Sequence, residues 1–181
     1  MRKRLIIGMS GASGAPLTIE LLKQLQQYKE IIETHLIVTK GAEMTLEQET
    51  DYTLEQLYAF ADEVHDNYNI GAGPASGSYR TMGMIVIPCS MKTLAGIVSG
   101  YSDNLVLRAA DITLKERRKK ISLPENGLSR YGNLSNNRCL CWQEYIMIIW
   151  KRMEVIRILD QLLENLEQEL QLRKTKYSQN V

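Results

Sequence analysis

GMIVIPCSMKTLAGIV, residues 83–98, is the most informative stretch of the chain. Its first part is a run of β-branched and apolar residues that stops at Pro88, which is typical of a buried strand. The polar residues that follow, Ser90 to Thr93, form a loop before an apolar segment at 94–98 that begins a helix. In an α/β sheet such a loop binds ligands, because free backbone N–H groups and the positive end of the helix favour an anion such as phosphate. The stretch therefore predicts a site for a phosphorylated ligand.

A second strand-to-helix loop opens the chain. Residues 4–9 (RLIIGM) predict a short strand, residues 10–15 (SGASGA) predict a tight turn, and Pro16 lies close to the start of a helix. The turn fits neither the dinucleotide-binding pattern G-x-G-x-x-G nor the Walker pattern G-x-x-x-x-G-K-[ST]. On its own it could be no more than a tight connection between a strand and a helix. Two such loops in one small domain favour phosphate binding.

Length and charge limit the class of protein. With 181 residues, 44% of them hydrophobic, the chain can bury one substantial core, so we expect residues 1–181 to form a single domain. The 22 basic and 21 acidic residues give a net charge of +1, which offers no electrostatic case for binding nucleic acid or an anionic membrane. The apolar run near the N-terminus is interrupted at Gly8, Ser10 and Gly11, so it is too short for a membrane span or the core of a signal peptide. We therefore expect a soluble, cytoplasmic protein.

The three cysteines predict neither a disulfide framework nor a metal site. An odd number of cysteines without CxxC spacing fits a reducing compartment. Cys139 and Cys141 lack the further Cys or His partners that zinc requires. Cys89 ends the predicted buried strand, where a small hydrophobic residue is a better interpretation than a nucleophile. We therefore expect no bound metal.

Strand and helix patterns alternate as far as Pro124. This alternation is typical of a parallel α/β sheet, so we expect residues 1–124 to form the core of the fold. The further predicted elements are a strand at 33–38 with Thr39 at its carboxyl end, helices at 41–48 and 54–64, a Gly/Ser/Asn-rich loop at 67–80, and a helix at 104–119. The basic residues at the end of the last helix complement its dipole, and residues 117–119 are interpreted as solvated surface.

The pattern changes after Pro124. Residues 125–153 form a divergent segment, in which 125–127 (ENG) and 131–137 (YGNLSNN) are rich in turn residues and show none of the alternation expected of a further strand. From Ile149 to Leu170 apolar residues recur every three or four positions, which predicts a long amphipathic helix that includes residues 154–176. Such a stripe is more often a docking face, within the fold or between subunits, than a cofactor site.

Four blocks of sequence occur together in the order and spacing of one known family. They are GMSGASGA (8–15), SGSYRT (76–81), PCSMKTLAGI (88–97) and DNLVLRAADITLKER (103–117). On these blocks the first two thirds of the chain resembles the UbiX-like flavin prenyltransferases, long described as phenylacrylic or hydroxyarylic acid decarboxylases. They belong to the wider group of homo-oligomeric flavin-containing Cys decarboxylases. The resemblance implies a Rossmann-like (flavodoxin-like) α/β fold, with helices on both faces of a parallel sheet in three α/β/α layers.

The resemblance also implies an activity. Family members bind reduced FMN and attach to it a dimethylallyl group from dimethylallyl phosphate, and the prenylated FMN serves UbiD-type aromatic acid decarboxylases. They assemble as homo-oligomers, either trimers or dodecamers. By resemblance, FMN is held by residues at the carboxyl ends of the predicted strands, namely Gly11, Ala12, Ser13, Thr39, Ser90, Met91, Lys92 and Thr93.

Four residues match family positions around the prenyl donor and flavin N5, namely Ser13, Glu49, Arg108 and Lys115. Release of phosphate loads negative charge on the leaving group, and fixed cations stabilise that charge. Arg108 and Lys115 are two helical turns apart, so they project from one face and could both meet one phosphate. Glu49 could accept a proton and Ser13 could relay it. Without the resemblance, Glu49 would be interpreted as an ordinary acid on a helix surface.

The last third of the chain departs from the family pattern. Relatives carry Pro-Arg-Glu where this chain has Pro124 followed by Glu125, and the aromatic loop of the family is absent. Arg157 matches a basic residue that binds phosphate, and Tyr145 is a candidate for the missing tyrosine of the donor site, although its spacing differs. These departures leave open a flavin-binding remnant with little or no catalysis. The older assignment, direct decarboxylation of a phenolic or aromatic acid, finds no dedicated group for a substrate carboxylate in the sequence.

Overall fold

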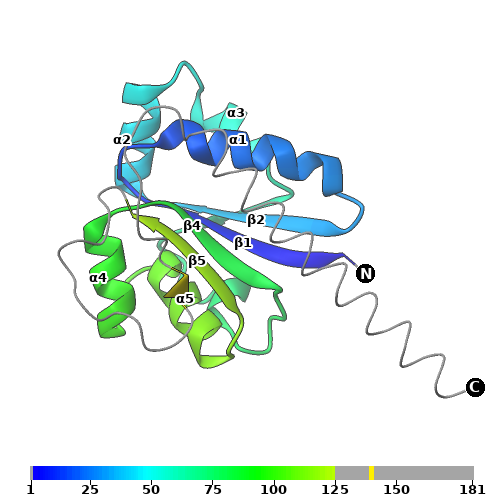
Figure 1. Ribbon diagram of the computed structural model, residues 1–181, viewed down its shortest axis with the longest axis vertical. Coiled ribbons are helices and arrows are strands. Elements are labelled where there is room, and N and C mark those ends of the chain that lie inside the picture. The colour runs from blue at the N-terminus through cyan, green and yellow to red at the C-terminus, as the bar shows by residue number, and fades with distance from the viewer. Residues whose placement is uncertain (1, 125–138, 141–181) are drawn as a thin grey trace, which may run out of the picture. The chain divides into compact units, whose positions relative to one another are not determined.

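The strands form one parallel sheet in the order β3-β2-β1-β4-β5-β6. The computed structural model describes residues 2–124 and 139–140, all within the first of two units of the chain, Met1–Tyr145, and it describes side chains for residues 2–118. The strands are β1 (Lys3–Met9), β2 (Ile32–Val38), β3 (Glu63–Asp66), β4 (Gly83–Cys89), β5 (Lys119–Pro124) and β6 (Cys139–Leu140). From β1 the chain builds the sheet outward to β2 and β3, then returns to β4 on the other side of β1 (Figure 1). The strand order therefore reverses between β1 and β4.

Helices cover both faces of the sheet. Figure 1 shows α1 (Ala15–Leu25), α2 (Lys40–Glu49) and α3 (Leu54–Tyr58) on one face, and α4 (Met91–Ser99) and α5 (Leu105–Lys115) on the other. Two short 3₁₀ turns, η1 (Gln26–Tyr28) and η2 (Gly73–Ala75), complete the described elements. The predicted three-layer α/β/α fold is confirmed. Within the described part of the chain, no helix has the length and apolar character needed to cross a membrane.

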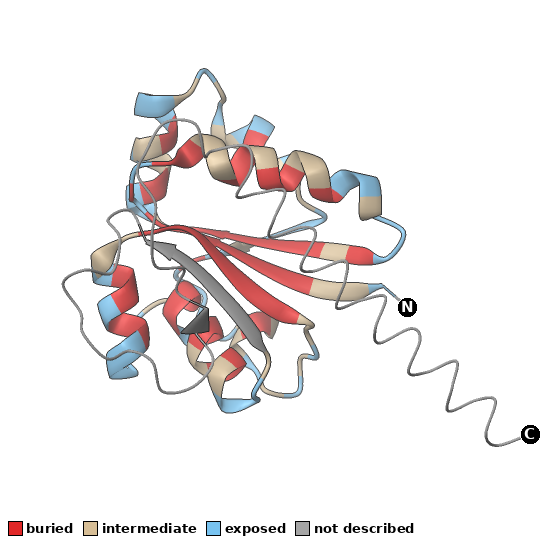
Figure 2. Ribbon diagram, in the orientation of Figure 1, coloured by how far each residue is buried: buried red, intermediate tan, exposed pale blue. Residues whose placement is uncertain are grey.

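The central strands are buried from both sides (Figure 2). Every residue of β4 is buried, which explains why its sequence is a continuous apolar run rather than an alternating one. On one face, Ile6 of β1 and Val86 of β4 belong to the same apolar cluster as Leu94 of α4 and Val106 of α5. Cys89 lies in this cluster and is fully buried, so its interpretation as a small hydrophobic residue is confirmed.

Polar side chains begin four of the described helices. Thr39, Thr53, Ser90 and Asn104 precede α2, α3, α4 and α5, and each accepts a hydrogen bond from the backbone N–H three residues further on. Such caps satisfy N–H groups that have no partner within the helix. α1 begins differently, after Gly14 with φ +119°, a backbone conformation that glycine adopts without steric cost.

The helix predicted at 54–64 is wrong beyond Tyr58. Asp62 fixes the chain to β2, because its backbone N–H donates to Thr34 Oγ1 (3.0 Å) and its carboxylate accepts from the Thr34 N–H (2.8 Å). Residues 63–66 then pair with β2 as the edge strand β3. Most of β3 is exposed, so it lacks the alternation of apolar and polar residues by which a half-buried strand is recognised.

The helix predicted at 104–119 is also too long. α5 ends at Lys115, Arg117 adopts the left-handed conformation (φ +55°), and β5 follows. Arg118 is not simply solvated, because its guanidinium donates to the carbonyl oxygens of Gly77 (2.6 Å) and Tyr79 (2.8 Å). These bonds anchor the loop that leads into β4.

The short strand β6 lies within 125–153, where the sequence predicted no strand. It pairs with β5 in parallel and so extends the sheet by one strand. The rest of that segment and the helix predicted at 154–176 lie outside the described residues. The single domain over 1–181 stays a prediction.

Candidate functional site

The two loops that the sequence singles out meet where the strand order reverses. Ser10 is buried directly after β1, and its Oγ donates to the Pro88 carbonyl oxygen (2.8 Å) and accepts from the Ser90 N–H (2.7 Å). The Ser10 N–H donates to the same Pro88 oxygen (3.1 Å). Ligands of α/β sheets bind at the carboxyl ends of strands at such a reversal. We call this place the switch-point site and define it by residues 10–14, Thr39 and residues 90–93.

The start of α2 adjoins the first loop of the switch-point site. The Thr39 N–H donates to the Met9 carbonyl oxygen (3.0 Å), which holds the end of β2 to the end of β1. Gly11 approaches Gly41 so closely that a Cβ on Gly11 would lie 2.7 Å from the Gly41 carbonyl carbon. Real Cβ atoms essentially never come so near backbone, so the position requires glycine. The beginnings of α1, α2 and α4 therefore gather at one edge of the sheet, where their dipoles favour an anion.

Glu49 binds the beginning of α1. Its Oε2 accepts hydrogen bonds from the N–H groups of Gly14 (2.8 Å) and Ala15 (2.9 Å). Glu49 is the last residue of α2, and these bonds bring its carboxylate to the loop that contains Ser13. Because Glu49 already takes two N–H groups at α1, the free capacity of the site for a phosphate lies mainly at the starts of α2 and α4.

The predicted FMN-binding residues all lie at this edge, but their exposure differs. Gly11, Ser13 and Lys92 are exposed, Thr39, Ser90 and Met91 are half-buried, and Ala12 and Thr93 are buried. The Ser90 hydroxyl accepts from the Thr93 N–H (3.2 Å) and donates to Thr93 Oγ1 (3.0 Å). These two bonds fix the first turn of α4 in place.

Arg108 and Lys115 lie on the other face of the sheet. Both belong to α5 and both are exposed, which agrees with their predicted position on one side of a helix. α5 packs against α4, β4 and β5, whereas the helix of Glu49 packs against α1. Arg108 makes an ion pair with Asp111 one turn along (3.6 Å). The structure thus brings Glu49 to the Ser13 loop, while the two cations stand in the opposite layer.

Two predicted donor-binding residues, Tyr145 and Arg157, lie outside the described residues. The sequence interpretation missed Ser10 and Gly41, which shape the switch-point site without being predicted to bind a ligand. A signal for Ser10 was present, since a polar residue directly after a buried strand needs a partner. Gly41 gave no comparable signal, because a glycine in the first turn of a helix is unremarkable until its neighbour across the sheet is known.

The fold and the switch-point site define a doubly wound α/β protein with a phosphate-type site. A family model described as Flavoprotein matches residues 1–139. A probable UbiX-like flavin prenyltransferase of Sedimentibacter hydroxybenzoicus is 52% identical over 121 residues, which are 67% of this chain and 64% of the relative. The chain thus spans less than two thirds of the length of this relative.

Two solved structures are similar over their backbones as well. The crystal structure of AnUbiX (PadA1) in complex with FMN and dimethylallyl pyrophosphate is 47% identical, with a TM-score of 0.67, over 68% of this chain and 65% of that one. A dodecameric FMN-dependent UbiX-like decarboxylase from Escherichia coli O157:H7 is 44% identical, with a TM-score of 0.65, over 87% of this chain and 75% of that one. The chain belongs to the Flavoprotein family and, within it, to the UbiX-like proteins.

Proposed function

We propose that the chain is a flavin prenyltransferase, which binds reduced FMN and joins to it a dimethylallyl group from dimethylallyl phosphate. The observation that carries this proposal is the switch-point site, where Ser10 ties together two strand-to-helix loops and Gly11 allows the backbone of α2 to approach. Similarity to AnUbiX, whose structure contains FMN and a dimethylallyl donor, supports the same assignment.

The residues of the switch-point site suit a flavin phosphate. Hydroxyls and backbone N–H groups at the starts of α2 and α4 favour an anion. The first turn of α4 has no acidic residue, and Glu43 in the first turn of α2 is paired with Lys40 (2.7 Å). Gly11, Ala12, Ser13 and Thr39 would hold FMN from one side, and Ser90 to Thr93 from the other. Reduced FMN supplies the nucleophile that the dimethylallyl group joins as its bond to phosphate breaks.

Glu49 and Ser13 are the proposed proton-transfer residues. Glu49 is held by two backbone N–H groups, so its carboxylate keeps one orientation beside the Ser13 loop. A carboxylate fixed in this way can accept a proton, and an exposed hydroxyl close to it can pass one on. This role depends on the fixed geometry as much as on the acid itself.

Arg108 and Lys115 are the proposed ligands of the donor phosphate, and a second copy of the chain would have to present them. Within one chain they lie in the layer opposite Glu49, where they are exposed to solvent. We therefore propose a homo-oligomer, a trimer or dodecamer, in keeping with the dodecameric relative. Arg157 and Tyr145 are proposed to complete the donor site. The prenylated FMN would serve a UbiD-type aromatic acid decarboxylase in the cytoplasm.

The test is an anaerobic turnover assay with the full chain, reduced FMN and dimethylallyl phosphate, followed by mass spectrometry of the flavin. We expect FMN to gain one dimethylallyl unit. Glu49→Gln should slow the reaction by about 10²-fold or more while FMN stays bound, because it removes a proton acceptor. Glu47→Gln, a change of the same type at an exposed position of the same helix, should leave the rate unaltered. Bound FMN that is never modified would identify a flavin-binding remnant, and loss of carboxylate from an aromatic acid without a partner would identify the older activity.

A further inference from the structure

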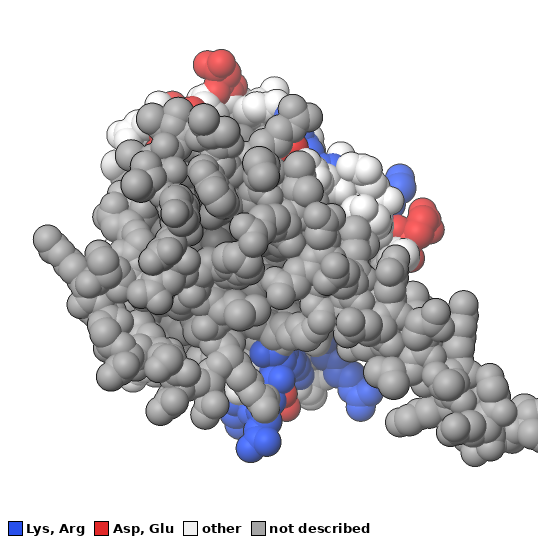
Figure 3. Space-filling model, in the orientation of Figure 1, with Lys and Arg blue, Asp and Glu red and all other residues white. Residues whose placement is uncertain are grey.

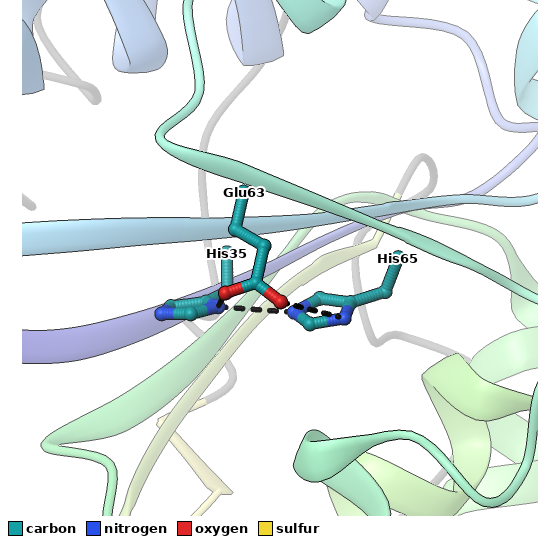
Figure 4. A group of neighbouring side chains, drawn as sticks. All are labelled: His35, Glu63 and His65. Atoms are coloured by element: carbon teal, nitrogen blue, oxygen red, sulfur yellow. Dashed lines mark hydrogen bonds and ion pairs between the residues drawn. The ribbon is translucent and has the colours of Figure 1, made fainter.

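A second group of polar side chains lies away from the switch-point site, on β2 and β3. His35 of β2 pairs in register with Glu63 of β3, and His65 follows two residues later. Paired residues of parallel strands point to the same face, and so do residues two apart in a strand. Figure 4 shows the three side chains together on one face. This is the α4–α5 face, because Ile37, two residues after His35, belongs to the apolar cluster with those helices.

The three side chains approach one another as ligands of one metal ion do. His35 Nδ1 is 3.0 Å from His65 Nε2 and 3.3 Å from Glu63 Oε2. Two ligands about 2.0–2.1 Å from a tetrahedral zinc ion are separated by roughly 3.3 Å. One ligand atom of each residue lies within 4.8 Å of the other two. The spacing therefore leaves room for an ion between them after small side-chain adjustments.

His35 Nδ1 has more neighbours than a ring nitrogen can satisfy. Besides His65 Nε2 and Glu63 Oε2, the Tyr79 hydroxyl lies 3.2 Å from the same atom. A ring nitrogen offers either one N–H or one lone pair. The hydrogen bond between the two rings therefore occupies the single N–H or lone pair of His35 Nδ1, and nothing remains for Glu63 or Tyr79. An ion bound to Nδ1 would instead engage His65 and Glu63 directly and leave Tyr79 to bond a water on the ion.

The surroundings also suit a cation. Glu33 Oε1 lies 3.5 Å from His35 Nε2, the ring nitrogen on the far side from the cluster. A carboxylate on that side favours the tautomer with the proton on Nε2, which leaves the Nδ1 lone pair for a metal, as carboxylates do behind many zinc-binding histidines. Arg4 offsets part of this charge, since its Nε lies 3.7 Å from Glu33 Oε2 and its guanidinium lies over the Tyr79 ring. Two carboxylates against one guanidinium leave a net negative charge.

The two histidines of the cluster are buried, and its glutamate is exposed to solvent. The side chain of His35 is fully buried and that of His65 is 8% exposed, whereas Glu63 is 51% exposed. An ion could enter past Glu63 without disturbing the sheet. Three protein ligands leave one position for water, as in zinc sites that are not closed by a fourth side chain.

We propose that His35, Glu63 and His65 form a binding site for a divalent transition metal, for which zinc is the best match. The expectation of no metal rested on the cysteines alone, which do not take part. The ion would fasten the exposed edge strand β3 to β2, because its ligands come from both strands. The site is separate from the flavin chemistry, and its test needs no turnover.

The chain offers an unusually clean test, because these two histidines are the only ones it has. Tag-free full-length protein is stripped with a chelator at neutral pH and titrated with zinc chloride. We expect one tight zinc per chain and an unfolding midpoint raised by about 5–10 °C when zinc exceeds its Kd a hundredfold. Long-range ¹H–¹⁵N NMR of the imidazoles should show zinc on Nδ1 of His35 and Nε2 of His65, and the hydrogen bond between the rings should disappear.

Variants distinguish this site from other zinc ligands such as the cysteines. Glu63→Gln removes one ligand at a half-exposed position and should weaken zinc binding at least about tenfold without unfolding the chain. His65→Gln should abolish the tight site. Glu55→Gln, at an exposed position of α3, is the matched control and should bind zinc like the unchanged chain. Zinc binding that persists unchanged in Glu63→Gln and His65→Gln, or a bond between the rings that survives excess zinc, would overturn the proposal.

Discussion

The switch-point site and the His35–Glu63–His65 cluster hold polar groups on one sheet in opposite ways. At the switch-point site, hydroxyls and backbone groups satisfy each other, as Ser10 does with Pro88 and Ser90. In the cluster, ionisable side chains crowd around a single ring nitrogen of His35. The first arrangement presents a preformed surface to an external anion, and the second concentrates ligand atoms around a point. One fold therefore carries two unlike sites, one at the carboxyl ends of β1, β2 and β4 and the other within β2 and β3 on the α4–α5 face of the sheet.

The largest effect on stability is expected at Gly11. Gly11→Ala places a Cβ 2.7 Å from the backbone of Gly41, so the start of α2 must move. Overpacking of this kind costs about 1–3 kcal/mol, and the value should lie near the upper end because neither partner is a flexible side chain. Urea unfolding would measure the loss, and FMN titration should show weaker binding. Gly71→Ala is the control, since its Cβ would meet only the Asn69 side chain at 3.5 Å and should change neither quantity appreciably.

Removing the link between the two loops should cost somewhat less. Ser10→Ala removes a buried hydroxyl and leaves the half-buried Ser90 N–H without its partner, which lowers the free energy of unfolding by about 1–3 kcal/mol. FMN binding should weaken as well, because the loops are no longer tied together. Ser102→Ala removes an exposed hydroxyl with a long bond to Gly100 (3.4 Å) and should be neutral in both assays. An equally small effect of both changes would mean that the loops hold their positions without Ser10.

The parts of the fold that the sequence predicted correctly are those that depend on local sequence. Strands, helix starts and the loop residues Thr39 and Ser90 could be predicted because each depends on a few neighbouring residues. The hydrogen bond that the Gly14 N–H donates to Glu49 joins residues 35 positions apart, so local sequence gave no sign of it, and only the family resemblance singled out Glu49. The helix predicted at 54–64 included the first two residues of β3, and no strand was predicted there, because an exposed edge strand carries no periodic apolar pattern.

The cluster escaped prediction for a related reason. His35 and His65 are 30 residues apart, and nothing in that spacing suggests a shared site. They meet only because β2 and β3 pair in a register that sets His35 beside Glu63. Since β3 itself was not predicted, that register could not be foreseen.

Two helix caps allow the effect of a lost cap on stability to be distinguished from its effect on FMN binding. Thr39→Ala and Asn104→Ala each remove a side chain that accepts from the third backbone N–H beyond it, at the starts of α2 and α5. In both variants the free energy of unfolding should fall by about 1 kcal/mol. Only Thr39→Ala should also weaken FMN binding in a fluorescence titration, because Thr39 belongs to the switch-point site. Equal FMN affinity in the two variants would remove Thr39 from that site.

The smallest effect concerns pH and the anchoring of β3. Burial tends to raise the pKa of Asp62, but hydrogen bonds from Thr34 and Arg2 outweigh it and hold the pKa below its ordinary value. A lowered pKa stabilises the fold above the ordinary value and loses this contribution as pH falls through the lowered one. Asp62→Asn should therefore reduce stability slightly at neutral pH, by less than about 1 kcal/mol, and not at all in strong acid. Urea midpoints measured from neutral to acidic pH would show whether the two curves converge.

The central claim is that the start of α4 binds a flavin anion, and FMN titration of two matched variants tests it most directly. Ser90→Glu places a carboxylate at the start of α4, and Ser99→Glu places the same group at its end, away from the switch-point site. We predict one FMN per chain in the unchanged protein and in Ser99→Glu, and affinity lowered by about 10²-fold or more in Ser90→Glu through repulsion between like charges. Equal FMN affinity in Ser90→Glu, with its unfolding midpoint preserved, would contradict the account.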